Sequence, residues 1–246
     1  MMEKRFTHEE YVQIINLYSD RIKSFNEAKG LSDFVILRHD VEFSITRALK
    51  MAKIEESKGI KSAYFFQVIS GAYNPFSNAH RDAIQMINKM GHSVGLHAYI
   101  SHLKAGDIDS LKNELEKQKN MFEFGVELNC TSFSFHRPPM WALELRKDNL
   151  CNMLNAYGPS FFEFSSQPKD IKYIADSKHD WSYGHPIEHE RERKIQILIH
   201  PDEWTEDGDE TLAEFFSGLK KEHELQFENT LKNETKHYAK AVGDSQ

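Results

Sequence analysis

The chain has few of the features that mark disulfide-stabilised, membrane or secreted proteins. Among its 246 residues only Cys130 and Cys151 are cysteines, too few for a disulfide scaffold or a four-cysteine zinc site. No apolar run approaches the roughly 18 residues that span a bilayer, and no apolar signal-peptide core follows the first charged residues. We therefore expect a cytoplasmic protein without a transmembrane segment.

Positive charge is also scarce. The chain carries 31 Lys and Arg against 38 Asp and Glu, which gives a net charge of −7 with histidine neutral. Because binding to a phosphate backbone depends on clustered positive charge, we do not expect a nucleic-acid partner. A hydrophobic fraction of 39% and an aromatic fraction of 12% exclude a disordered chain. The length fits one large α/β domain, so we expect a single domain over residues 1–246.

Strand-like and helix-like segments alternate along the chain. We expect strands near 34–37, 60–68, 92–96, 130–135 and 195–199, with short β-like runs at 161–164 and 171–174. We expect helices near 7–30, 45–58, 79–90, 107–123 and 141–155, a loop over 176–194, and a C-terminal tail that is acidic from about 205, then helical, and frayed at its end. Such alternation is typical of βαβ units, in which parallel strands form an open sheet or a barrel. We favour a barrel-like α/β domain.

Polar side chains follow four of the expected strands. They are His39, Asp40 and Glu42; His97 and His102; His136 and Arg137; and His200. In parallel α/β architectures ligands collect at the carboxyl ends of the strands, so these residues can share one mouth. Imidazole is the commonest metal ligand in proteins and the usual acid or base near neutral pH, which makes the histidines the residues to follow.

Two carboxylates follow the first strand. Asp40 and Glu42 are two residues apart and therefore point to the same side if the strand continues. Such a pair can bind a divalent cation, or divide the roles of metal ligand and general base. Alternatively, the two acids cap the following helix or pair with Arg38 and Arg47.

The other strand ends offer partners for these acids. His97 and His102 can reach one metal if the chain between them loops, although a lone strand-end histidine is more often a hydrogen-bonded structural residue. Arg137 can pin a carboxylate or orient a catalytic acid, or simply form an ion pair. His200 ends an apolar strand and is our candidate general acid. Trp181, in the expected loop, can stack on a sugar or pack the loop.

Taken together, these segments resemble a divergent branch of the polysaccharide deacetylase family, the metal-dependent carbohydrate esterase family 4 (CE4) type. The resemblance covers about residues 34–204, with 205–246 as a helical extension, and rests on five segments in order: 35–42, 59–66, 91–97, 135–139 and 197–200. It implies a distorted (β/α) barrel with fewer than eight regular strands, here with an N-terminal helix and a helical C-terminal tail. It also implies a zinc-like ion held by one Asp and two His, with a second Asp as base and a late His as acid.

The family's adjacent aspartate pair corresponds to the region of Asp40 and Glu42, but here Val41 intervenes and the second acid is a glutamate. Counting back from Ser62-Ala-Tyr-Phe65 places Glu42 at the metal-binding position and leaves Asp40 as the base or a second ligand.

The metal histidines correspond to His97 and His102, whose spacing is one residue longer than the family's usual spacing. If His102 does not reach the metal, His136 replaces it, or the site is metal-free and inactive. The arginine-proline motif corresponds to Arg137 and the late acid to His200.

The activity that the resemblance implies is removal of an N-acetyl group from a sugar or glycan by a zinc-dependent hydrolase. For a cytoplasmic protein the substrate is then a soluble precursor, such as a nucleotide-linked or lipid-linked sugar. Two alternatives stay open: a catalytically inactive protein that binds a glycan or other ligand on the same fold, and a hydrolase of another C–N bond such as a formamide. The sequence does not indicate an oligomeric state.

Overall fold

A curved eight-stranded sheet forms the centre of the computed structural model, which describes residues 5–163, 170–209, 211–238 and 241. The strand order is β5-β6-β4-β3-β2-β1-β8-β7. The strands are β1 (Phe34–Val41), β2 (Ala63–Phe66), β3 (Ser93–Tyr99), β4 (Ser132–His136), β5 (Asn149–Leu150), β6 (Met153–Asn155), β7 (Lys172–Ala175) and β8 (Lys194–Ile199). Every pairing is parallel except that of β5 with β6. Strand β1 lies between β2 and β8, so its carboxyl end is central.

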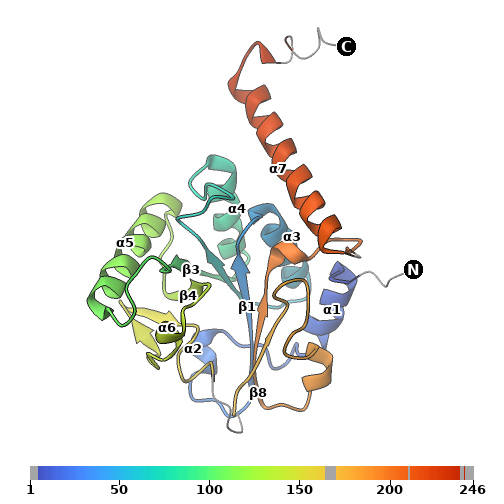
Figure 1. Cartoon of the computed structure of the whole chain (residues 1–246). Helices are drawn as coiled ribbons and strands as arrows, with labels where there is room; N and C mark the ends of the chain where they lie inside the picture. The colour runs from blue at the N-terminus through green and yellow to red at the C-terminus, as the bar shows by residue number, and fades with distance from the viewer. Residues whose placement is uncertain (1–4, 164–169, 210, 239–240, 242–246) are drawn as a thin grey trace.

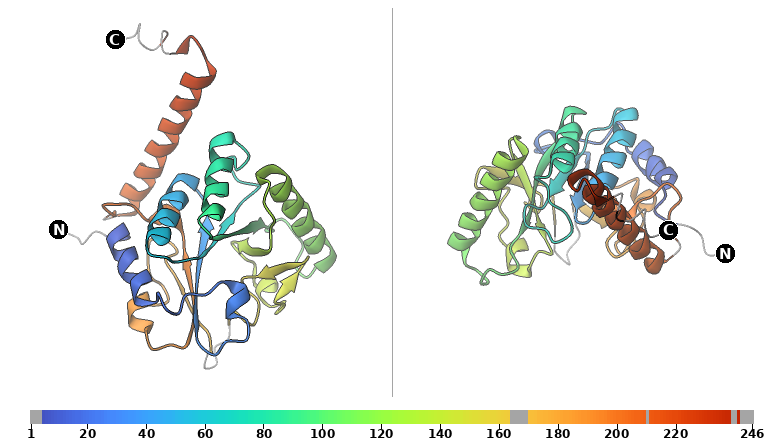
Figure 2. Two further views of the ribbon diagram at one scale, coloured as in Figure 1. Left: turned by 180° about the vertical axis from the view of Figure 1, so that it is seen from behind. Right: turned by 90° about the horizontal axis from the view of Figure 1, so that it is seen from above.

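Helices cover the outside of the sheet (Figure 1). They are α1 (His8–Leu17), α2 (Phe25–Ala28), α3 (Ile45–Ser57), α4 (Asn78–Lys89), α5 (Ile108–Val126), α6 (Met140–Leu143) and α7 (Leu212–Glu234), with short 3-10 segments η1 (Pro186–His189) and η2 (Pro201–Glu203). Helices α3, α4 and α5 pack side by side in chain order, and α7 projects away from the body (Figure 2). In the described part of the chain, no helix is long and apolar enough to cross a membrane.

The expected α/β alternation and barrel-like sheet are confirmed, with an N-terminal and a C-terminal helix. The barrel is incomplete, because within the described residues no ladder joins β5 to β7 at the two ends of the sheet. The side chains of β1 that face the inside of the curved sheet change from apolar to polar along the strand. Phe34 and Ile36 pack in an apolar cluster with Phe65 and Phe161, whereas Arg38 and Asp40 further along the strand are polar. One end of the barrel is therefore filled with apolar groups and the other can hold a polar site.

The helix expected over 7–30 is wrong in its middle part. Helix α1 ends at Leu17, and the backbone near Ile22 instead pairs with Val35 of β1. Ser24 then begins the short α2 with a capping box that includes Glu27. An extended connection between α1 and α2 buries some of the apolar residues of this segment. Their spacing in the sequence is also compatible with one longer helix, so the spacing alone does not distinguish the two structures.

The helix expected over 141–155 is also wrong. Helix α6 ends at Leu143, and β5 and β6 form an antiparallel hairpin in which Leu150 pairs with Met153. Its two loop residues, Cys151 and Asn152, have φ values of 52° and 57°. Two-residue hairpin loops favour this left-handed conformation because it matches the twist of the strands.

Two smaller expectations also change. Residues 161–163 of the β-like run expected at 161–164 are not in a strand, and residue 164 lies outside the described residues. The tail remains helical as far as Glu234, whereas its expected frayed end falls largely on residues 242–246, outside the described part.

Candidate active site

The carboxyl ends of the central strands meet at one cavity. It has a volume of about 1050 Å³ and is lined by residues from or just after β1, β3 and β8, among them Asp40, Glu42, His97 and His200. Arg137, which follows β4, also lines it. Four of the sequence segments singled out by their strand-end polar residues are therefore neighbours in space.

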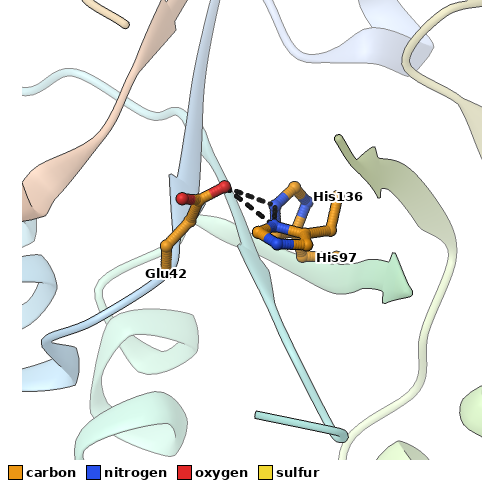
Figure 3. A group of neighbouring side chains, drawn as sticks. All are labelled: Glu42, His97 and His136. Atoms are coloured by element: carbon orange, nitrogen blue, oxygen red, sulfur yellow. Dashed lines mark hydrogen bonds and ion pairs between the residues drawn. The ribbon is translucent and has the colours of Figure 1, made fainter. Parts of the chain in front are cut away.

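Three side chains place potential metal ligands close together (Figure 3): Glu42 and His97 line this cavity, and His136 lines a smaller pocket that also contains Glu42. Glu42 Oε1 lies 2.9 Å from His136 Nδ1 and 3.3 Å from His97 Nε2, and these two nitrogens lie 3.2 Å apart. A tetrahedral zinc ion with bonds of about 2.0–2.2 Å separates its ligands by about 3.3 Å. One carboxylate and two imidazoles are also a usual zinc donor set. The residues present therefore fit a divalent cation.

The charge of Glu42 also suits a cation site. Burial alone would raise its pKa, but the adjacent imidazoles of His136 and His97 hold the pKa of the Glu42 carboxyl well below its usual range. Its backbone is fixed as well, because the Asp202 carboxylate accepts the backbone N–H groups of Glu42 and Phe43 at 3.0 Å. Asp202 follows His200 in η2 and so ties the loop after β1 to the loop after β8.

A hydrogen-bond chain orients His97. Its Nδ1 lies 2.7 Å from the hydroxyl of Ser134 on β4, and this hydroxyl donates to Asp40 Oδ1 at 2.9 Å. The chain favours the tautomer with the proton on Nδ1, which leaves the lone pair of Nε2 for a cation. Support of a ligating histidine through its other nitrogen is general at metal sites.

Asp40 lies beside the three potential ligands but is not one of the group. Arg38 donates to both of its oxygens, from Nε at 3.0 Å and from Nη2 at 2.6 Å. Burial raises the pKa of Asp40, but the guanidinium of Arg38, with a smaller effect of His97, outweighs burial and lowers this pKa to about 2. Arg38 was named from the sequence only as an alternative ion-pair partner. Its two-residue spacing from Asp40 on a strand is the signal that places both on the inner face.

His200 has a dedicated partner that the sequence analysis missed. Its Nδ1 lies 2.6 Å from Asp176 Oδ1, and its backbone N–H donates to the same carboxylate. The indole N–H of Trp204 donates to Asp176 Oδ2 at 2.8 Å. Burial lowers the pKa of His200, but the carboxylates of Asp176, Glu42 and Asp40 together outweigh burial and raise this pKa to about 10. Asp176 directly follows β7, so the strand-end rule that selected the histidines also applies to it.

Two sequence-predicted residues lie away from the cavity wall. His102 is exposed within a turn at residues 100–103 and stacks on Tyr99, with ring centroids 5.8 Å apart. His136, which the sequence offered only as the alternative to His102, lies in the group of potential ligands. Trp181 is only 8% exposed and packs near Phe6 and Trp204, with ring centroids 5.9 and 6.1 Å away, so it packs the loop rather than forming a rim.

No protein-family model matches the sequence, and no curated protein is significantly similar to it. Solved structures of the CE4 family are similar to the chain in fold. A CE4 family pseudoenzyme from Bacillus anthracis is 16% identical with a TM-score of 0.45, over 76% of this chain and 60% of that chain. A family 4 carbohydrate esterase from Bacillus anthracis is 16% identical with a TM-score of 0.43, over 85% of this chain and 86% of that chain.

The Bc1960 peptidoglycan N-acetylglucosamine deacetylase is 15% identical with a TM-score of 0.44, over 70% of this chain and 73% of that chain. This chain spans about three fifths of the length of the CE4 family pseudoenzyme described above. At such identities and scores, the likenesses carry no argument about activity.

Proposed function

We propose that this chain is a metal-dependent hydrolase that removes an N-acetyl group from a sugar or a glycan precursor. One observation carries the proposal: the atoms of three potential cation ligands all lie within 4.8 Å of one another, and two of these residues, Glu42 and His97, line one cavity with His200, whose Nδ1 lies 2.6 Å from the Asp176 carboxylate. Amide hydrolysis needs an activated water, stabilisation of the carbonyl oxygen as it becomes negative, and a proton for the departing amine.

Glu42, His97 and His136 would hold the cation, and zinc suits this donor set. A divalent cation bound there polarises a carbonyl group and lowers the pKa of water. The contribution of Glu42 is a negative charge that persists at neutral pH, and that of His97 is a nitrogen aimed by Ser134.

Asp40 is the base of the proposed reaction and accepts the proton of the attacking water at a carboxylate oxygen. Arg38 and Ser134 fix its position and keep it ionised. A pKa of about 2 makes Asp40 a weak base at neutral pH, because proton transfer is most efficient when the pKa lies near the working pH. We therefore assign it an effect at the low end of general-base catalysis, about 100-fold.

His200 is the proposed acid. Asp176 binds Nδ1 and stabilises the imidazolium, so Nε2 carries a proton at neutral pH for the departing amine. Arg137, at the edge of the cavity, is the proposed contact for polar groups of the sugar.

The alternative is an inactive binding protein on the same fold. The ion pair between Arg38 and Asp40 favours it, because a carboxylate engaged by a buried guanidinium is a poor base.

Metal content and acetate release, measured on a panel of N-acetylated sugars, distinguish the two functions. The hydrolase predicts acetate release that a chelator abolishes and added zinc restores. Sugar binding without metal and without acetate favours the inactive protein. Release of formate from N-formyl sugars, with acetate release absent, shifts the proposal to a different C–N bond.

A further inference from the structure

We infer that the substrate carries an alkyl chain next to the scissile amide, bound along an apolar wall of the active-site cavity. The inference rests on the proposed function, since it concerns the same cavity. The apolar wall is defined by Phe162, Tyr173, Tyr183, Leu212, Phe215 and Phe216, all of which line the cavity. At about 1050 Å³ the cavity matches the upper limit for sites of drug-sized ligands, about 300–1,000 Å³.

Aromatic rings connect the apolar wall to the reacting groups. The hydroxyl of Tyr157 accepts a hydrogen bond from Arg38, which also holds Asp40. The ring centroids of Tyr157 and Phe162 lie 5.1 Å apart, and so do those of Phe162 and Tyr173. The ring of Tyr183 follows, 5.5 Å from that of Tyr173. A chain lying along these rings would therefore begin beside the proposed base and end at a residue that is 52% exposed.

The first turn of α7 supplies the rest of the wall. Leu212 and Phe216 are 46% and 57% exposed although both are apolar and line the cavity. An ion pair of 2.8 Å between Arg47 of α3 and Glu222 anchors α7 to the body of the protein. Large apolar groups exposed together at the mouth of a cavity are typical of a binding surface.

The acidic groups beside the wall already have partners. The Glu203 carboxylate lies 2.7 Å from His179 Nδ1, and the Glu163 carboxylate accepts the backbone N–H of Asp170 at 2.8 Å. Ser177, Lys178 and Arg137 also line the cavity and can bind a sugar there, whereas the apolar wall offers mainly ring and aliphatic surfaces, on which an alkyl chain leaves no polar group unpaired. An alkyl chain therefore fits the wall better than further sugar units do.

The chain can belong to the amine side of an N-acetyl group, or to the acyl side, in which case the released group is a longer acyl group than acetyl. Two series of probes distinguish these sources. One series is N-acylglucosamines with acetyl, hexanoyl and octanoyl groups, and the other is methyl, hexyl and octyl glycosides of N-acetylglucosamine. Calorimetry on the full chain loaded with zinc gives the dissociation constants at concentrations below micelle formation. We expect the dissociation constant to fall by roughly twofold to fourfold per methylene in one series, from the free energy of burying each methylene. Equal affinity across both series overturns the inference.

Two phenylalanines on α7 provide a matched pair of variants. Phe216→Ala should weaken binding of the preferred octyl or octanoyl probe by about tenfold, as expected for loss of an exposed aromatic contact. Phe227 is 65% exposed on the same helix and is not part of the cavity lining, so Phe227→Ala should leave binding unchanged. Equal effects of the two substitutions contradict the inference.

Acyl release is measured in parallel on the same probes. Binding that depends on chain length without acyl release supports the apolar wall and contradicts the hydrolase. Acyl release without dependence on chain length supports the hydrolase and overturns the alkyl-chain inference.

Discussion

Strand β1 separates two buried polar clusters that are built alike but differ in their access to a cavity. The inner cluster is Arg38, Asp40, Ser134 and His97, and the outer cluster is His39, Glu55, Tyr11, Tyr64 and Ser62. Each contains a carboxylate that is at most 2% exposed and has a pKa of about 2. Neighbouring residues of one strand point to opposite faces, so Asp40 enters one cluster and His39 the other.

The outer cluster is closed around Glu55. Its Oε1 lies 2.7 Å from His39 Nε2 and also accepts the hydroxyl of Tyr11. Its Oε2 accepts the hydroxyls of Ser62 at 2.7 Å and Tyr64 at 2.8 Å. These four hydrogen-bond partners occupy the lone pairs of both carboxylate oxygens of Glu55. The cluster lies beneath α1 and α3. The two clusters share a lowered carboxyl pKa and deep burial, so these properties alone do not distinguish a candidate reactive site from a structural one; the difference is that Asp40 and His97 line the cavity.

The largest expected effect separates the two histidines proposed for the second metal position. His136→Ala should reduce zinc binding and acetate release to background, because it removes one of three cation ligands. His102→Ala is the matched control and should retain both, since His102 lies on Tyr99 outside the ligand group. Equilibrium dialysis with zinc and acetate assays check both variants. The reverse pattern would assign the ligand to His102.

The second-largest expected effect concerns His200, the proposed general acid at the cavity. His200→Ala should lower kcat by about 10²–10⁴-fold, the usual contribution of a positioned general acid. Zinc affinity should stay the same, because His200 is not among the proposed ligands. Steady-state kinetics and zinc titration test this. Full activity in the variant would remove His200 from the role of acid.

A substitution in the outer cluster should act on stability instead. Glu55→Gln replaces a carboxylate that has four buried hydrogen-bond partners with an amide that has only one acceptor oxygen, and each buried group left unpaired costs about 1–3 kcal/mol of unfolding free energy. Urea unfolding measures this loss, and kcat per folded molecule should be unchanged. A large fall in kcat with unchanged stability would mean that the two clusters are not functionally separate.

The smallest effect is a pH dependence of stability in the same cluster. Burial raises the pKa of Glu55, but its contacts with His39, His92 and Tyr11 together outweigh burial and lower this pKa from 4.5 to about 2 in the folded chain. A depressed pKa stabilises the fold above the unfolded value, and this contribution, about 3 kcal/mol, is lost as the pH falls from about 4.5 to 2. Urea unfolding across this range should show a shallower decline for Glu55→Gln than for the unaltered protein. Parallel declines would exclude Glu55 as the cause.

The fold and most of the inner residues could be predicted from local patterns. Apolar runs located the central strands, and the rule that ligands lie at strand ends selected Asp40, Glu42, His97 and His200. The second histidine could not be decided from spacing, because it depends on whether the chain after β3 turns back toward Glu42. It turns away at residues 100–103, and the neighbouring strand β4 brings His136 into place.

Other features depended on tertiary contacts that a local pattern does not contain. The hairpin at Cys151 and Asn152 shows apolar spacing that also suits a helix, and only the positive φ values of its loop distinguish it. Asp176 acquires its importance from pairing with His200, which is 24 residues away in sequence.

The most direct test of the central claim is anomalous scattering at the zinc absorption edge, measured on crystals grown with zinc. The account predicts one strong peak about 2.0–2.2 Å from a carboxylate oxygen of Glu42, Nε2 of His97 and Nδ1 of His136. A cavity that shows no such peak at saturating zinc, or a peak bound by His102 in place of His136, would contradict it.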